Sequence, residues 1–155
     1  MTKLSVDAIQ RAIANLADPK VNFRIDLAST PHVASRIIQS LPGVKELSED
    51  GPAVEAALLA LLNDDQIYQD EYFASIGLHI LSSYPSERVK LALAKPIRER
   101  KFRGFSSQFA AEAFLKAAGI QTPSEKAIAT ALRVAKKLET TNQLNTENTP
   151  KSVEQ

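Results

Sequence analysis

The sequence contains no cysteine and no tryptophan, and it has only one methionine and five glycines among its 155 residues. The lack of cysteine excludes disulfide bonds, thiolate metal sites and a cysteine nucleophile, and it fits a reducing compartment. So few glycines exclude a collagen-like chain. No apolar run approaches the ~18–20 residues needed to cross a bilayer, and the N-terminus does not resemble a signal peptide. We therefore expect a cytoplasmic protein without a membrane segment.

The chain does have an ordinary supply of apolar residues, 44% of the total, together with 24% charged residues. This balance is typical of a globular domain and is too apolar for a disordered protein. The length suits one domain. The polar segment 140–155 differs, since Leu144 and Val153 are its only large apolar residues. We predict a helical domain over residues 1–139 and a disordered tail over residues 140–155.

Apolar residues recur at helical spacing along the whole domain. The clearest of these stretches follow the N-terminus and cover residues 52–62, 70–83, 106–118 and 123–138. Gly119 followed by Ile120 predicts a left-handed helix end. Residues 21–27 instead alternate between apolar and polar, as a half-buried strand does. Because no second strand-like run is present to pair with it, we favour a short helix there. The pattern predicts an all-α fold of six or seven helices.

Prolines mark several expected helix starts. Pro31, Pro52 and Pro123 each stand at a predicted first helical position, where the missing N–H of proline costs no hydrogen bond. Thr122 and Glu125 have the spacing of a capping box, in which each side chain bonds the backbone of the other. Pro96 is expected to interrupt or kink the helix that precedes it, and Gly104 is expected to end the segment that follows.

The second half of the domain contains an internal repeat. Phe73-Ala74 recurs 36 residues later as Phe109-Ala110, and Pro85-Ser86-Glu87 recurs 38 residues later as Pro123-Ser124-Glu125. Each copy leads into a helix rich in alanine and leucine. A period in the thirties built from helix pairs is typical of an α-solenoid, in which each pair needs a neighbour to bury its apolar face.

Residues 16–21, Leu-Ala-Asp-Pro-Lys-Val, with Ala28 behind them, resemble the D-P-x-V-(R)-x-x-A signature of HEAT-like repeats. The sequence departs from that signature at Asn22, where an arginine usually follows the valine. The resemblance implies antiparallel helix pairs stacked as a short right-handed α-solenoid. It also implies a surface that binds other macromolecules, since only a minority of such families are catalytic. No functional residue is transferred from the family to this chain.

The formal net charge of +1 hides an uneven distribution. Residues 1–87 contain six basic and twelve acidic residues, whereas residues 88–103 contain seven basic residues and Glu99 alone. Within this basic segment (residues 88–103) and just beyond it lie the residues that we predict to bind a partner: Lys95, Arg98, Arg100, Lys101, Phe102, Arg103 and Phe105. The cations would steer an acidic protein partner, and one of the two phenylalanines would serve as an aromatic anchor.

Two other interpretations of this segment remain open. Cations with interleaved aromatic rings also suit nucleic acid, which is the alternative function. In the third interpretation the phenylalanines face the core, and the cations are solvated or paired with the acidic half of the chain. No sequence motif of a known nucleic-acid-binding module is present.

Catalytic signatures are scarce. Asp64, Asp65, Asp70 and Glu71 lack the spacing of a calcium loop, and helix capping explains them better. His79 lies on a polar stripe with Glu71, Ser75 and Ser82, which suggests a histidine at a surface or groove. A phosphotransfer role for His79 is a third hypothesis. The sequence thus predicts a non-catalytic binding module (an adaptor, inhibitor or subunit) with no metal and no cofactor.

Overall fold

The computed structural model describes residues 6–18, 20, 24, 31–40 and 52–139, and these residues form helices and turns without a β-strand. The predicted all-α class is therefore confirmed for this part of the chain. Of residues 21–27, for which we favour a short helix over a strand, only Arg24 is described, and it is helical. The tail predicted at 140–155 lies outside the described residues and stays a prediction.

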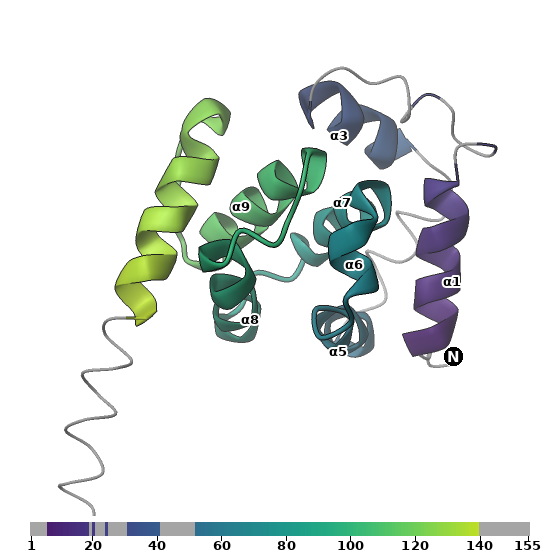
Figure 1. Ribbon diagram of the computed structural model, residues 1–155, viewed down its shortest axis with the longest axis horizontal. Coiled ribbons are helices and arrows are strands. Elements are labelled where there is room, and N and C mark those ends of the chain that lie inside the picture. The colour runs from purple at the N-terminus through teal and green to yellow at the C-terminus, as the bar shows by residue number, and fades with distance from the viewer. Residues whose placement is uncertain (1–5, 19, 21–23, 25–30, 41–51, 140–155) are drawn as a thin grey trace, which may run out of the picture.

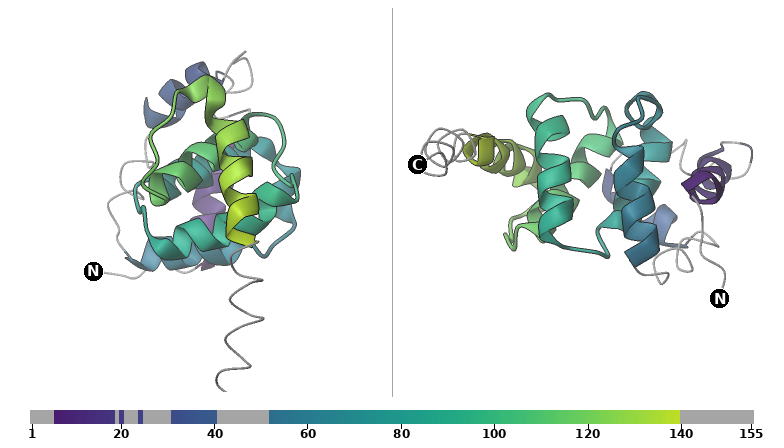
Figure 2. Two further views of the ribbon diagram at one scale, coloured as in Figure 1. Left: turned by 90° about the vertical axis from the view of Figure 1, so that its left-hand side faces the viewer. Right: turned by 90° about the horizontal axis from the view of Figure 1, so that it is seen from below.

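The described helices follow one another along the long axis of the molecule, nearly in the order of the sequence (Figures 1 and 2). They are α1 (Val6–Ala17), α3 (Pro31–Ser40), α5 (Pro52–Leu61), α6 (Gln66–Gln69), α7 (Glu71–Leu81), α8 (Glu87–Arg98) and α9 (Phe105–Ala117). A 3-10 turn at Ser124–Lys126 leads into a last helix at residues 127–139, called the final helix below. Helix α1 and the final helix stand at opposite ends of the molecule.

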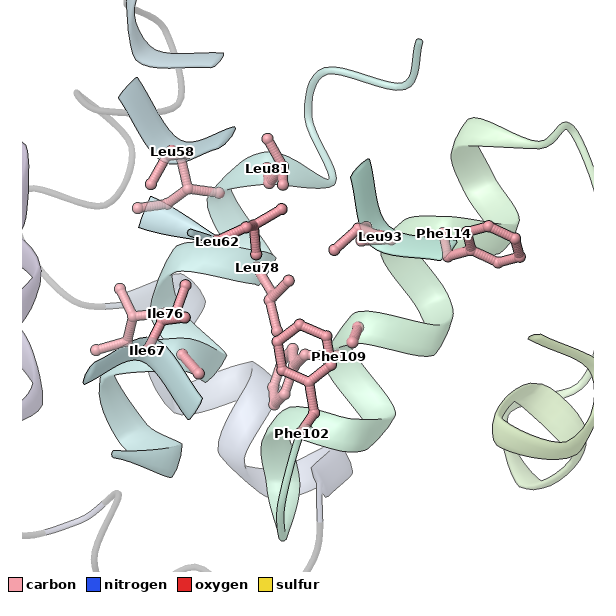
Figure 3. Close-up of a cluster of buried hydrophobic side chains, with 14 of the residues drawn as sticks. Leu58, Leu62, Ile67, Ile76, Leu78, Leu81, Leu93, Phe102, Phe109 and Phe114 are labelled. Atoms are coloured by element: carbon pink, nitrogen blue, oxygen red, sulfur yellow. The ribbon is translucent and has the colours of Figure 1, made fainter. Parts of the chain in front are cut away.

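Helix α7 lies at the centre of the core. It packs against α1 and α5 on one side and against α9 on another. Gly77 faces the first of these sides, where an added Cβ would meet Leu58 at 3.8 Å and Ile13 at 3.9 Å. On the side that faces α9, Leu78 of α7 and Phe109 of α9 belong to one cluster of buried side chains (Figure 3). Helix α7 therefore joins the N-terminal helices to α9, and α9 in turn packs against α8.

The polar stripe predicted along residues 70–83 is not a free surface. Ser75 is only 1% exposed, and its hydroxyl donates a hydrogen bond to the carbonyl oxygen of Glu71 at 2.6 Å. This local bond satisfies the hydroxyl without water. His79 is half-buried, with its ring 6.2 Å from that of Phe109. The stripe correctly indicated a helix, and α9 contacts two of its residues, Glu71 and His79.

Local side chains determine where several helices begin. The carboxylate of Asp70 accepts the backbone N–H groups of Tyr72 and Phe73 at 3.1 and 3.0 Å, which confirms the capping interpretation of that residue. Ser86 caps α8 by accepting the N–H of Val89 at 3.3 Å. Pro31 and Pro52 are the first residues of α3 and α5, as predicted.

The start predicted at Pro123 is wrong. Pro123 has an extended backbone (φ −60°, ψ 146°), and no side chain caps the turn that follows it. The capping box expected between Thr122 and Glu125 is therefore absent, because the chain enters the final helix through the 3-10 turn. The Ser124 carbonyl oxygen instead accepts a hydrogen bond from the Gln108 side chain at 2.8 Å, which attaches this turn to α9.

The end predicted at Gly119 is confirmed. Gly119 has a φ of +73°, its N–H bonds the carbonyl of Lys116 at 3.2 Å, and the N–H of Ile120 bonds that of Leu115 at 2.9 Å. These two bonds are those of a Schellman motif, which closes a helix with one residue in the left-handed conformation.

Gly104 ends the segment that follows Pro96, as predicted, and it is also the residue from which α9 begins. It precedes α9 with a φ of +55° and a ψ of −134°, a conformation that residues with a Cβ rarely adopt. The carboxylate of Glu71 accepts the N–H of Phe105 at 2.7 Å, and a Cβ on Gly104 would come within 1.9 Å of that carboxylate. A carboxylate at a helix N-terminus also interacts favourably with the helix dipole. The positive φ therefore favours glycine here, and an added Cβ would displace the Glu71 carboxylate from its hydrogen bond with Phe105.

None of the helices within the described ranges combines the length and the apolar character that a bilayer-spanning segment requires.

We expect Gly104→Ala to lower the free energy of unfolding by about 2 kcal/mol or more, because the substitution adds backbone strain and a collision that pushes the Glu71 carboxylate away from the N–H of Phe105. Gly119→Ala is the matched control, since Gly119 also has a positive φ but an added Cβ there meets nothing within 4 Å. That control should cost only about 1 kcal/mol. Urea unfolding of both variants measures the difference, and equal losses would show that the collision with Glu71 contributes nothing.

Candidate partner-binding surface

The predicted binding residues lie on the turn between α8 and α9, and this turn has a defined backbone. The N–H of Arg100 bonds the carbonyl of Ile97 at 3.1 Å, and the N–H of Lys101 bonds that of Pro96 at 3.0 Å. These bonds form a second Schellman motif, with Arg100 in the left-handed position at a φ of +54°. Pro96 therefore lies in the last turn of α8, which continues for two residues beyond it.

Arg100 occupies the position that Gly119 occupies at the end of α9. It is the only non-glycine residue with a positive φ among the described residues. For a residue with a Cβ, the left-handed conformation costs roughly 1–2 kcal/mol. The chain thus holds an exposed arginine where glycine would be the more stable residue, and the backbone conformation sets the direction of its Cα–Cβ bond.

Four cations of the basic segment are already engaged with carboxylates. Their pairs are Arg88 with Glu55 at 2.9 Å, Lys90 with Glu87 at 2.9 Å, Arg98 with Glu139 at 3.1 Å and Lys101 with Glu99 at 3.7 Å. Glu55 is 8% exposed and also accepts a hydrogen bond from Ser86 at 2.9 Å, so its pair joins α5 to the start of α8. This pair matches the interpretation in which basic residues are bound by the acidic half of the chain.

Arg98 has a structural role at the end of α8. Besides its ion pair with Glu139, it donates a hydrogen bond to the carbonyl oxygen of Ala135 at 3.4 Å. Both acceptors belong to the final helix. Arg98 therefore attaches that helix to α8, and we no longer count it among the cations available to a partner.

Lys95, Arg100 and Arg103 are the cations of the predicted site that form no ion pair within the described residues. All three are exposed and lie on the last turn of α8 or on the turn that follows it. They are called the free cations below. Solvated cations at the end of a helix and on the turn that follows it can attract an acidic group without first breaking an internal pair.

The two phenylalanines of the predicted site are directed inward to different degrees. Phe102 is 7% exposed and belongs to the core, where Figure 3 shows it beside Phe109. Its ring lies 5.2 Å from that of Tyr68. Phe105 is half-buried, with its ring 6.3 Å from that of Tyr72. Phe102 is therefore unavailable as an aromatic anchor, because burying it is what holds the turn against the core.

Tyr68 joins α6 to the α8–α9 turn. Its hydroxyl donates to the carbonyl oxygen of Leu62, and the ammonium group of Lys101 lies 5.0 Å from the centre of its ring. A cation over an aromatic face is held by the charge distribution of the ring. Burial raises the pKa of Tyr68 to about 12, and the nearby carboxylates of Glu99 and Asp65 raise it as well. Lys101 is thus held by Tyr68 as well as by Glu99.

A pocket of about 320 Å³ opens beside this turn, between α8, α9 and the final helix. Its apolar walls are Pro96, Ile97, Phe102, Ala111, Ile128 and Leu132. Arg100 and Ser107 complete the lining. Ile128 keeps 47% of its surface exposed, which is high for a large apolar side chain in this structure. The pocket therefore combines an apolar interior with one free cation.

His79 lies between α7 and α9 rather than on an outer surface. Burial lowers the pKa of His79 below its usual value of 6.5, and the cation of Lys116 on α9 lowers it further. Both effects favour the neutral ring in the folded protein. Its edge-on contact with the ring of Phe109 is a packing interaction.

The acidic residues near α7 cap helices. Asp70 caps α7 itself, and Glu71 caps α9. Across the described ranges, no three His, Asp or Glu side chains are grouped so that they could hold a metal ion.

Comparison with protein-family models, with curated proteins and with solved structures found no match for this chain.

Two features of this surface are not evident from the sequence pattern. Tyr68 is an isolated aromatic residue in a short helix, and nothing in the pattern pointed to Phe102 as its partner. Ile128 had the helical spacing of a core residue, yet the final helix buries mainly Ala127, Ala131 and Ala135. The sequence spacing of these alanines was a usable signal, because a stripe of small residues lets a helix approach its neighbour closely and turns Ile128 to the side.

We expect Arg100→Gly to raise the free energy of unfolding by roughly 0.5–1 kcal/mol, since glycine removes the left-handed strain but loses more entropy on folding. Gly119→Arg is the reciprocal variant and should lower it by a similar amount. Urea unfolding of both variants provides the measurement. A destabilised Arg100→Gly variant would show that the arginine side chain supports the fold.

The folded protein should lose stability as the pH falls below about 6.5. In that range the unfolded chain protonates His79, whereas the folded protein, with its lowered pKa, binds the proton only at lower pH. Replacing His79 by glutamine should remove this part of the pH dependence. Urea unfolding of the parent and of His79→Gln at about pH 7.5 and about pH 5.5 tests the prediction. If the free energy of unfolding changed equally with pH in both proteins, the prediction would be contradicted.

Proposed function

We propose that this chain is a non-catalytic binding module that presents the α8–α9 turn to an acidic segment of a protein partner. The observation that carries the proposal is the left-handed Arg100. Glycine would relieve the strain at this position, yet the chain keeps a long cation there, exposed and without a carboxylate partner among the described residues. Strain retained at an exposed turn is typical of residues that serve binding rather than stability.

We propose a HEAT-like α-solenoid as the architecture. The repeat in the sequence equates α7 with α9 and α8 with the final helix. Helix α7 packs against its counterpart α9, and Arg98 bonds α8 to the final helix near the C-terminal ends of both. Contacts between equivalent helices of successive pairs are what a solenoid requires. The arrangement of the helices along the long axis in chain order supports the same architecture (Figures 1 and 2).

A protein partner fits this surface better than nucleic acid does. Protein grooves that bind single-stranded nucleic acid combine cations with exposed aromatic rings on which the bases stack. Here Phe102 is buried and Phe105 packs against Tyr72. The carboxylates of Glu99 and Asp65 also line a second hollow together with Arg100 and Arg103, and they would repel a continuous phosphate backbone. A short acidic peptide needs only a few cations and can avoid these carboxylates.

The test places a photo-crosslinking amino acid at Arg103 and exposes the protein to a lysate of its source cells, with and without nuclease. We expect a protein adduct that survives nuclease treatment and weakens at high salt. Replacing Lys95 and Arg100 together by glutamate should reduce the adduct at least tenfold, because like charges then face the acidic segment.

Two controls make this result specific. The same crosslinker at Arg133, an exposed cation of the final helix, should not give the same adduct. Replacing Lys126 and Arg133 by glutamate makes the same change in net charge and should leave the adduct unchanged. An adduct made of nucleic acid, or one that both double variants reduce equally, would overturn the proposal.

A further inference from the structure

The pocket beside Arg100 indicates which side chains a partner would place there, whereas the charges indicate only that the partner is acidic. Of the side chains that line it, Arg100 is the only charged one, and the walls are otherwise almost entirely apolar. At about 320 Å³ the pocket lies near the lower end of the size range of ligand sites. It therefore suits one or two apolar side chains with an anionic group at the rim.

We propose that the pocket receives an apolar side chain of the protein partner and that Arg100 binds a carboxylate next to that side chain. This inference rests on the proposed function and specifies its recognition motif. The partner segment would then be a short peptide in which a leucine or phenylalanine stands beside glutamate or aspartate.

Charge complementarity favours a peptide that carries a carboxylate next to its apolar side chain. The guanidinium group of arginine offers paired donors that match the two oxygens of a carboxylate. Arg100 forms no ion pair within the described part of the chain, so binding would not break an existing one.

The apolar wall supplies the second half of the motif. Ile128 contributes a large side chain with 47% of its surface exposed, and Leu132 lies one helical turn further along the same face. An anchor that fills such a pocket removes this surface from water. Apolar anchors surrounded by polar contacts carry most of the affinity in many protein interfaces.

Two labelled hexapeptides test the proposal directly. The first contains a Leu-Phe pair flanked by glutamates, and the second has Ala-Ala in place of that pair. We expect the Leu-Phe peptide to bind at least about tenfold more tightly by fluorescence anisotropy, as burial of a large apolar side chain implies. Amide NMR signals of Ala111, Ile128 and Leu132 should shift when this peptide is added.

Matched variants assign the effect to the pocket. Ile128→Gln should reduce the preference for the Leu-Phe peptide to about twofold or less. Leu91→Gln is the control, since Leu91 is 48% exposed on α8 and does not line the pocket. Arg100→Gly should weaken binding of the glutamate peptides but not of a Leu-Phe peptide flanked by glutamines. Because Arg100→Gly is expected to stabilise the fold, weaker binding cannot be attributed to unfolding.

The outcomes separate this inference from the function on which it rests. In one outcome the two glutamate peptides bind equally tightly, and this binding is lost when Lys95 and Arg100 are replaced by glutamate. That result would refute the role of the pocket and support the proposed function. Binding of the Leu-Phe peptide regardless of its flanking charges would support the apolar half alone and overturn the role of Arg100. Signals that shift away from the pocket, or no binding of any peptide at millimolar concentration, would overturn the inference. Displacement of the peptide by an oligonucleotide at equal salt would favour the nucleic-acid alternative.

Discussion

The contact between the Glu71 carboxylate and the N–H of Phe105 determines where α9 begins, and the position of the basic turn depends on it. Glu71 is the first residue of α7, so one side chain couples the starts of two helices that are 34 residues apart in sequence. Gly104 makes room for the carboxylate. With both ends of the turn fixed, by this contact and by the Schellman motif at Arg100, the free cations project from a rigid base.

The sequence predicted the local features of this fold well. Asp70 as a cap, Pro31 and Pro52 as helix starts, and Gly119 as a helix end all depend on neighbouring backbone atoms, and all are confirmed. The start predicted at Pro123 is a local error, whereas the other errors concern contacts between distant segments. The buried Ser75 and the glycine at the start of α9 reflect the packing of α7 against α9, which periodicity cannot reveal. A repeating pattern identifies one apolar face of a helix but not a second neighbour that covers its polar face.

The candidate site was only partly predictable for the same reason. Charge counts located the basic segment, because charge is a property of each residue taken alone. Which cations are engaged depends on partners such as Glu55 and Glu139, which are distant in sequence. From the sequence, Phe102 suits both an exposed aromatic anchor and a core residue. Its burial in the structure shows that it is a core residue. The apolar pocket required three helices to be placed together before it could be recognised.

The position of the final helix has a consequence for local stability. As the last helix of the described domain, it has a packing neighbour on only one side, and Arg98 holds its C-terminal end. Elements at the ends of a fold generally open at lower free energy than central ones. The wall formed by Ile128 and Leu132 therefore belongs to a helix that we expect to open more readily than α7 or α9. Occupation of the pocket would slow hydrogen exchange along residues 127–139. Partner binding and the local opening of the final helix would then be thermodynamically coupled.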